Sequence, residues 1–592
     1  MPTLNSTSAV FSRSAADADS DERTARDNFN AGQFDQWPND AGFSGLTEQR
    51  GPLSLAVTGS IPPWAAGSLY RTGPAVYAVD RPGAAPYTVK HWFDGLGQTH
   101  KFDIIPASDG NSARVVYSSR RQSDGTIAEI KAGRQRDFTF AQGVDPCVGL
   151  FGKAMAMFKA PVTYANVQVT VNANIGALPN TLAAPSVVTS SPRKSATSST
   201  KSTTPPQEST AGHRTNVQNI WLATDGPALL QLDPLTLKPS TRTITIDTAI
   251  SHLTTHASCA HAAHDPHTGE FFNFSLRYGP TPEYAIFRLP PSTQPPPAKP
   301  TILARLHGAR APVAYIHSVF LTENYFVMCI PSARLALHGL AILWHRTILE
   351  SMQPFSAEQL CFWHVISRQT GAVVARFETP AAFFFHSTNA FERDGRLFCE
   401  MLEYPNTDIL RAFYLAVMRD ADGHGRDFWK TYAATAAHMG ALRRYMFDLG
   451  GAAGADKMGP APEVVMQIRG PHVGELPTIN PAYAMREHRY VYSVVARGLS
   501  TMFDALSKAD MQTGNVLLWS GDRGHTPGEP IFVTDPEGKG EDDGVLLSVV
   551  LDGINGTSYL LCLDAKTMEE LGRAECGFAI GLGFHGLHAK AI

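Results

Sequence analysis

Four histidines with similar neighbours are the residues of this sequence that could do chemistry together. The chain has 592 residues and 21 histidines, and it contains no GxSxG, P-loop, Rossmann glycine or HExxH motif. His261, His317, His386 and His585 lie beside small or aromatic residues, in SCAHAAHDPHTGE, YIHSVFLTENYF, FFFHSTNAFERDG and GFHGLH. Separations of 56, 69 and 199 residues exclude a local metal loop. If the fold brings these side chains together, neutral imidazoles could bind one metal ion.

Spacing alone does not select His261 within its own segment. Four other histidines lie close by in the chain: His252, His256, His264 and His267. Any of them could supply an imidazole at this point, and most histidines are ordinary surface or core residues. On spacing, the identity of the first ligand therefore stays open.

Most of the chain is predicted to form short β-strands. Stretches such as FFNFSL, FVMCI, YVYSVV and VLLSVVL are dense in β-branched and aromatic residues, and turn residues separate them. Turns of one kind recur, among them LDPLTL, HDPHTGE, ADMQTG and LDAKTM, in which an aspartate can cap the turn. Repeated strand and turn units favour the blades of an all-β propeller, with a pair of β-sandwiches as the alternative. A propeller would bring the inner strands of distant blades, and hence the four histidines, together on its axis.

The composition along the chain suggests one large domain with a tail and two insertions. Residues 1–36 are predicted to be a disordered tail, and residues 37–592 a single propeller domain. Residues 177–214 are rich in Ser, Thr, Pro and Ala, which predicts a flexible insertion. Prolines in residues 289–300 predict a stiffer loop. Residues 408–450 (from DILRAFYLAVMR to ATAAHMGALRRYM) read as a helical insertion that caps one face of the β-unit.

Charge and cysteine content exclude several classes of function. The net charge of −4 provides no basic excess for nucleic acid. Charged residues make up 18% and hydrophobic residues 43%, which predicts a folded, globular protein with a large core. The seven cysteines form no CxxC pair, and we find neither a signal peptide nor a transmembrane segment. We expect a cytoplasmic protein without a cysteine-based metal site.

Eight short motifs resemble those of the carotenoid cleavage oxygenase family, in the same order. The resemblance extends from about Trp37 to the C-terminus. Each motif is weak alone, but eight in order are very unlikely by chance. They are GSLYRTGP (67–74), HWFDG (91–95), AHxxxDPxTGE (260–270), HSVFLTENY (317–325), FHxxNAFE (385–392), ELPTINP (475–481), GEPIFV (528–533) and GFHG (583–586).

The resemblance implies an all-β fold, a seven-bladed β-propeller with a helical cap over the active-site face. It also implies one non-haem Fe(II) per chain, held on the axis by His261, His317, His386 and His585. The four-residue offset to Asp265 in the family motif selects His261 from its neighbours. Four nitrogen ligands would leave an octahedral iron with two open positions for O2 and an alkene.

In this family, glutamates support the metal-bound imidazoles from behind. The matching motifs place such carboxylates at Glu475 and Glu529. At a third position, in WLATDGPALLQLDP, this chain has Asp225. Aspartate is one methylene shorter than glutamate, so its carboxylate could need a bridging water to reach its histidine.

The expected reaction is cleavage of a conjugated C=C bond with O2 to give two aldehydes. Residues 37–43, 115–127 and 140–153 resemble the fungal branch that contains resveratrol-cleaving and torulene-cleaving oxygenases. We expect a hydroxystilbene such as resveratrol as the preferred substrate, cleaved at its interphenyl bond. Carotenoid or apocarotenoid cleavage, for example of torulene or β-carotene, is the alternative. A non-catalytic binding propeller and an isomerase are minor alternatives.

A tyrosine and a lysine bind the phenol in stilbene-cleaving relatives. Tyr117 is the candidate tyrosine, and Lys153 or Lys131 the candidate lysine. A strand-core aromatic is the alternative reading of Tyr117. Separately, LALHGLAILWHRTIL from Leu335 to Leu349 could form an amphipathic patch that contacts a membrane surface, with an ordinary buried helix or strand pair as the alternative.

Overall fold

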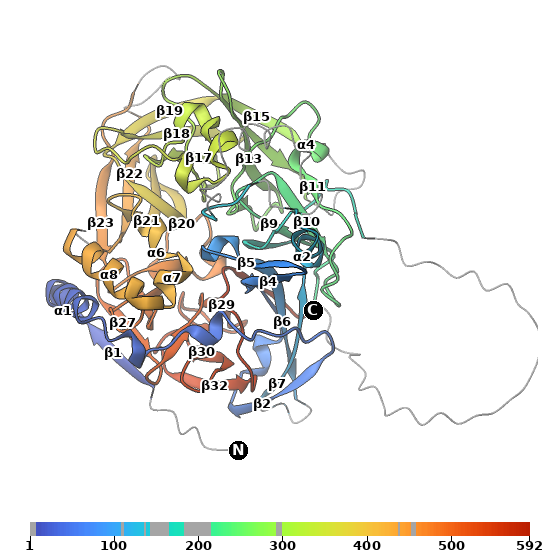
Figure 1. Ribbon diagram of the computed structural model, residues 1–592. Coiled ribbons are helices and arrows are strands. Elements are labelled where there is room, and N and C mark those ends of the chain that lie inside the picture. Colours follow the sequence, from blue (N-terminus) through green and yellow to red (C-terminus); the bar gives the residue numbers. More distant parts are fainter. Residues whose placement is uncertain are drawn as a thin grey trace, which may run out of the picture.

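Antiparallel sheets arranged around a central axis make up most of the protein (Figure 1). The computed structural model describes residues 8–107, 110, 112–134, 138–142, 165–182, 215–291, 299–435, 439–450 and 458–592. Most sheets are formed by strands consecutive in the sequence, so each is one blade of a propeller.

Five blades are separate sheets. The first four have four strands each, and the last has five. In sheet order they are β11 (Ile244–Thr245), β10 (Ala228–Leu232), β9 (Ile220–Ala223) and β8 (Thr170–Ala173); β12 (Ala263–His264), β13 (Phe271–Arg277), β14 (Glu283–Leu289) and β15 (Thr301–Leu306); β16 (Phe320–Leu321), β17 (Tyr325–Ile330), β18 (Cys361–Ser367) and β19 (Val373–Thr379); β20 (Phe383–Arg393), β21 (Arg396–Tyr404), β22 (Ala441–Asp448) and β23 (Glu463–Arg469); and β1 (Ala9–Arg13), β27 (Val516–Ser520), β26 (Ala505–Asp510), β25 (Tyr490–Val495) and β24 (Glu475–Thr478).

The remaining ten-stranded sheet contains two blades and closes the ring. Strand β2 (Leu53–Gly59) joins them, because it pairs with a strand of each. The last strand of the chain, β33 (Gly586–Lys590), pairs with the early strand β3 (Gly67–Val76). The other strands are β6 (Leu96–Pro106) and β7 (Ala113–Arg121) in one blade, and β28 (His525–Pro527), β29 (Ile531–Thr534), β30 (Gly544–Asp552), β31 (Thr557–Asp564) and β32 (Glu570–Glu575) in the other. The fold is a seven-bladed β-propeller, as predicted.

Hydrophobic packing between blades explains why these sequences form sheets. Strand residues that are alternately buried present their large side chains to the neighbouring sheet. Between two of the blades, Trp363 and Phe377 of one sheet pack against Phe384, Tyr445 and Phe447 of the next. This packing holds the inner strands in place around the axis.

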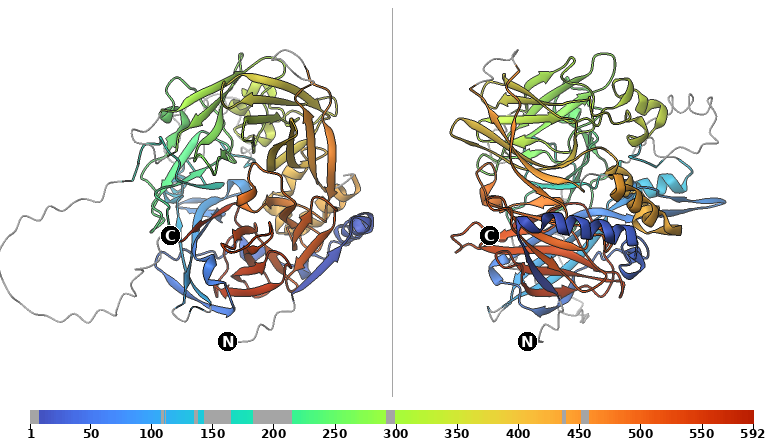
Figure 2. Two further views of the ribbon diagram at one scale, coloured as in Figure 1. Left: turned by 180° about the vertical axis from the view of Figure 1, so that it is seen from behind. Right: turned by 90° about the vertical axis from the view of Figure 1, so that its left-hand side faces the viewer.

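Helices gather on one face of the propeller. They include α2 (Asp124–Lys131), α5 (Ala341–His345), α6 (Ile409–Ala412), α7 (Leu415–Met418) and α8 (His424–Thr435). In the right-hand view of Figure 2, α2 (cyan), α5 (olive) and α8 (orange) lie on the same side of the sheets. The hairpin of β4 (Ala78–Arg81) and β5 (Ala84–Thr88) projects on that side too, and the one-turn helix α4 (Ile246–Ala249) follows β11.

The predicted disordered tail, residues 1–36, is wrong for the described part. Residues Ala9–Arg13 form β1, paired with β27, and Ala18–Ala31 form helix α1. The polar composition concealed an i, i+3, i+7 stripe: Glu22, Ala25 and Phe29 are buried. Phe29 stacks on Trp429 of α8 with ring centroids 4.5 Å apart. The segment therefore holds part of the cap against the propeller.

The helical insertion predicted over residues 408–450 is correct only in its first part. Helices α6, α7 and α8 lie within residues 409–435, but ALRRYMFD forms strand β22 between β21 and β23. Pairing on both edges outweighs the helical propensity of these residues. Residues 183–214 of the predicted flexible insertion and 292–298 of the proline-rich loop lie outside the described residues. Within the described ranges, no helix has the length and apolarity that crossing a membrane requires.

Candidate metal centre

Four histidines from four blades meet at the axis. His386 lies in β20, while His261, His317 and His585 come shortly before β12, β16 and β33. One ligand nitrogen from each of the four lies within 4.8 Å of the others. The exposed His264, two residues into the same segment as His261, points elsewhere and is not part of the cluster.

The spacing of the nitrogens fits a single metal ion. Nε2 of His585 lies 2.8 Å from Nε2 of His261 and 3.2 Å from Nε2 of His386. Imidazole nitrogens bind a transition metal at about 2.1 Å, so neighbouring ligands of an octahedral ion lie roughly 3 Å apart. The cluster has the donor type and the spacing of a metal site with four nitrogen ligands.

Burial keeps these imidazoles in the form that binds metal. Removal from water, together with the neighbouring histidines of the cluster, lowers the pKa of His261 and of His585 well below the usual value. Both rings are therefore neutral at physiological pH. A neutral imidazole keeps a lone pair free for a metal.

Carboxylates fix the orientation of three of the rings. Nδ1 of His386 lies 2.5 Å from Glu475, and Nδ1 of His585 lies 2.8 Å from Glu529. A carboxylate behind Nδ1 requires the proton on that nitrogen, so Nε2 is left to face the centre. The structure thus brings both glutamates singled out in the sequence behind histidines of the cluster.

Asp225 reaches its histidine directly, which corrects the expected need for a bridging water. Its oxygens lie 2.8 and 3.0 Å from Nδ1 of His317. The main chain makes up for the missing methylene, because Ser258 N–H donates to the Asp225 carbonyl and Ala260 N–H to its carboxylate. These two bonds hold the turn after β9 close to the axis.

Glu529 sits in the driest of the three carboxylate positions. Burial raises its pKa to about 7, although Arg71 and the N–H of Gly586 counteract that rise. Nη1 of Arg71 lies 3.2 Å from Glu529, and Nη2 donates to the carbonyl of Phe584. Arg71 therefore ties the carboxylate to the chain just before His585.

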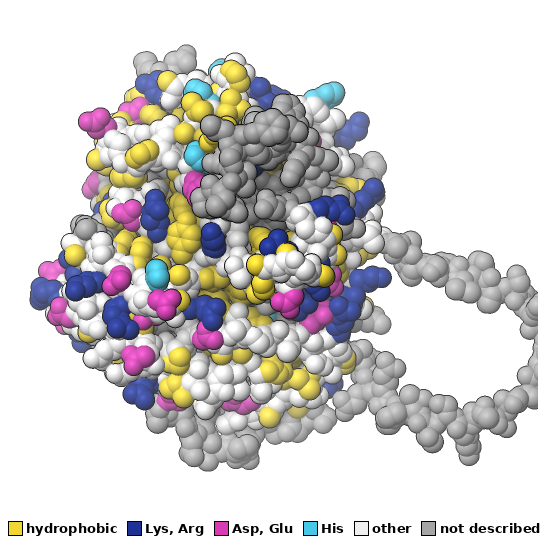
Figure 3. All heavy atoms as spheres, in the orientation of Figure 1, with side chains coloured by type: hydrophobic (Ala, Val, Ile, Leu, Met, Phe, Trp, Pro, Cys, Tyr) yellow, Lys and Arg dark blue, Asp and Glu magenta, His cyan; other side chains and the backbone are white. Residues whose placement is uncertain are grey.

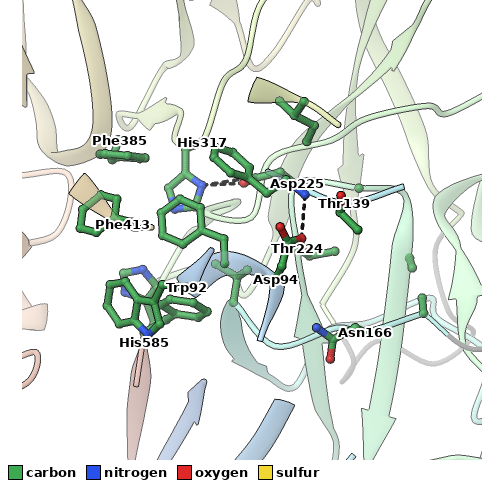
Figure 4. A pocket seen from close by; sticks show the side chains of 18 of the residues that line it. Trp92, Asp94, Thr139, Asn166, Thr224, Asp225, His317, Phe385, Phe413 and His585 are labelled. Carbon is green, nitrogen blue, oxygen red and sulfur yellow. Dashed lines mark hydrogen bonds and ion pairs between the residues drawn. The ribbon is translucent and has the colours of Figure 1, made fainter. Parts of the chain in front are cut away.

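A cavity of about 480 Å³ opens beside the histidines (Figure 4). Its wall near His317 and His585 is aromatic and includes Trp92, Phe385 and Phe413. Polar side chains such as Asn166 and Thr224 lie farther from the cluster. The Asn166 amide bonds to the main chain of Gly95 and Gly97, so it shapes the wall.

The predicted phenol-binding residues do not come together at this cavity. Tyr117 lies in the blade core with Phe102 and Val115, and its hydroxyl lies 2.7 Å from Nδ1 of His100. Strand alternation in β7 turns its side chain away from the axis, so the predicted contact with substrate is wrong. Lys131 is exposed at the end of α2, and Lys153 lies outside the described residues.

Sequence reasoning missed the residues that build the cavity wall. Asp94 is buried and accepts hydrogen bonds from the N–H groups of Phe140 and Ala141 at 2.7 and 2.8 Å. It thereby fixes the loop that contributes Phe140 to the wall. The HWFDG motif, which contains Trp92, Phe93 and Asp94, was the available signal.

A seven-bladed propeller with four histidines gathered on its axis defines a class of protein, the carotenoid cleavage oxygenases. The family model described as RPE65, retinal pigment epithelial membrane protein, matches residues 42–590. The chain therefore belongs to this family and is an enzyme of the carotenoid cleavage dioxygenase class. The resemblance drawn from the eight sequence motifs is confirmed.

Relatives of this chain cover nearly its whole length. A carotenoid dioxygenase of Neurospora crassa is 42% identical, with 100% of this chain and 97% of the relative covered. A torulene dioxygenase of Fusarium fujikuroi is also 42% identical, with 98% and 99% covered. Among solved structures, cobalt-substituted Synechocystis ACO is similar with a TM-score of 0.65 and 23% identity, covering 94% of this chain and 99% of that one.

Asp225→Glu tests how tightly the third carboxylate is fitted. The extra methylene has to fit between Ala260 and His317, and overpacking a filled interior costs about 1–3 kcal/mol. We therefore expect a Co(II) affinity lower by about 5- to 100-fold in titrations of the metal-free protein. Asp233→Glu, in an exposed turn of the same blade, is the control. Binding as tight as wild type would contradict the close fit.

Proposed function

We propose that this protein binds one Fe(II) through His261, His317, His386 and His585 and cleaves a conjugated C=C bond of a carotenoid or apocarotenoid with O2. The observation that carries the proposal is the position of four neutral imidazoles at the end of an aromatic cavity. A solved relative whose title describes it as cobalt-substituted supports a metal at this position. An iron ion held here would supply the activation of O2.

The protein's own residues would bind and orient the polyene. Aromatic rings such as Trp92, Phe385, Phe413 and Phe584 offer a polarisable surface to a flat conjugated chain and keep water out. One oxygen atom of O2 would enter each of the two aldehydes, so that the C=C and O=O bonds are replaced by two C=O bonds. No proton transfer to a side chain is needed for this balance.

The comparisons favour a carotenoid over the hydroxystilbene that we expected first. Relatives at 42% identity are named as carotenoid and torulene dioxygenases. In addition, the described cavity lining includes neither tyrosine nor lysine that could bind a phenol. A buried hydroxyl without a partner loses binding energy, whereas a hydrocarbon chain does not need one.

We further propose that the enzyme takes its apolar substrate from a membrane surface. Leu337 is 72%, Leu343 44% and Trp344 37% exposed, within the segment predicted to contact a membrane. Exposed Phe138, beneath the guanidinium of Arg346, also lines the cavity. Figure 3 shows hydrophobic side chains on this face of the molecule. The cytoplasmic location expected from the sequence stays a prediction.

Replacing one cluster histidine tests the metal site. His317→Ala removes a nitrogen ligand and leaves Asp225 without its imidazole, so we expect most of the iron and all cleavage activity to be lost. His264→Ala, at an exposed position in the same region, should retain both. Iron content by elemental analysis and aldehyde formation give the readout. Full iron occupancy in His317→Ala would refute the ligand assignment.

Substrate preference can be decided by product analysis. We expect aerobic incubation with torulene or β-carotene to give apocarotenoid aldehydes, and incubation with resveratrol to give no hydroxybenzaldehyde. Tyr117→Phe should leave carotenoid cleavage unchanged, because this side chain lies in the blade core. Products identified by mass spectrometry check both. Efficient resveratrol cleavage would reverse the ranking of substrates, and binding without turnover by the iron-loaded protein would favour a carotenoid-binding propeller.

Membrane contact predicts a loss of vesicle binding when the exposed leucines become polar. Each buried leucine contributes roughly 1–2 kcal/mol, so Leu337→Ser with Leu343→Ser should lower partitioning into phosphatidylcholine vesicles by about 10-fold or more. Ile554→Ser, also at an exposed hydrophobic position, is the control. Co-sedimentation measures the partitioning. Equal binding of the leucine variant and wild type would argue against this contact.

A further inference from the structure

The three carboxylates behind the histidines are themselves held by partners of two kinds. Asp225 accepts a hydrogen bond from the hydroxyl of Tyr315 at 2.9 Å, and Glu475 accepts one from the hydroxyl of Tyr404 at 2.6 Å. Glu529 instead contacts the guanidinium of Arg71. Two neutral phenols thus do for His317 and His386 what a cation does for His585.

Both phenols are placed to act as donors. Burial, followed by the charge of the adjacent carboxylate, raises the pKa of Tyr315 and of Tyr404 well above the usual value. The hydroxyls therefore remain protonated. Since an ionised carboxylate only accepts hydrogen bonds, the direction of each bond is fixed.

One aromatic ring connects the two tyrosines. The centroid of Phe383 lies 6.2 Å from that of Tyr315, with ring planes 22° apart, and 6.4 Å from that of Tyr404, with planes 30° apart. Phe383 also meets Phe385 edge to face at 4.7 Å. Because Phe385 lines the cavity, this group of rings connects the substrate wall to the carboxylates.

We propose that Tyr315 and Tyr404 are positioning residues for the metal-binding imidazoles, acting through Asp225 and Glu475. A carboxylate with one oxygen tied to a phenol presents the other oxygen to Nδ1 in one orientation, and the ring behind which it lies is fixed as well. Without the phenol, the carboxylate turns within its pocket and the imidazole loses its alignment. The inference rests on the proposed metal site.

Phenylalanine variants test the two hydroxyls while keeping the ring stack. In Co(II) titrations of the metal-free protein, followed by the visible absorption of the bound ion, we expect Tyr315→Phe and Tyr404→Phe each to weaken binding by roughly 3- to 30-fold. Tyr492→Phe is the matched control, since Tyr492 is equally buried and donates to the Ala565 carbonyl at 3.0 Å, away from the cluster. It should change thermal stability but not Co(II) affinity or the spectrum.

A double-mutant cycle separates positioning from general packing. If Tyr404 acts through its carboxylate, Tyr404→Phe should have little further effect on Co(II) affinity in a Glu475→Gln background. Additive effects, or wild-type affinity in both phenylalanine variants, would overturn the inference while leaving the metal site intact. Failure of the wild-type protein to bind Co(II) or Fe(II) would overturn the proposed function as well.

Discussion

The crowding of four unprotonated imidazoles on one axis is the constraint on which the rest of the structure depends. Nitrogens 2.8 Å apart repel if either ring gains a second proton, and burial prevents this by lowering the pKa of His261 and His585. The carboxylates behind three of the rings then decide which nitrogen faces inward. A metal ion would replace mutual repulsion with shared coordination, so the apo cluster is arranged for a charge that it does not itself contain.

Ring closure is what brings the cluster together. His585 lies 324 residues from His261 in the sequence, yet their Nε2 atoms are in contact. Pairing of β33 with β3 delivers the C-terminal residues to the first blade, and Arg71 in β3 ties Glu529 to the chain beside His585. The same interactions therefore close the propeller and complete the site, which couples fold stability to ligand geometry.

Motifs carried the prediction where chemistry fixes residue type, and failed where long-range packing decides. The four histidines, Glu475 and Glu529 could be placed because each sits in a short motif. Tyr117 could not, since its neighbour Val115 two residues away already marked a buried strand face. Helix α1 was missed because its partner Trp429 lies 400 residues away, and no local signal reveals such a contact. The direct reach of Asp225 depends on the main chain at residues 258–260, which sequence cannot position.

Substrate recognition in this cavity must rest on shape more than on polar contacts. Aromatic walls attract any flat conjugated chain by dispersion, so they discriminate weakly between polyenes of similar width. Asn166 and Asp94, the polar groups with settled partners, spend their hydrogen bonds on the main chain and hold the wall in place. The bond that meets the histidines is consequently set by how far the chain can enter, and residues that fix the wall control regiochemistry without touching the substrate.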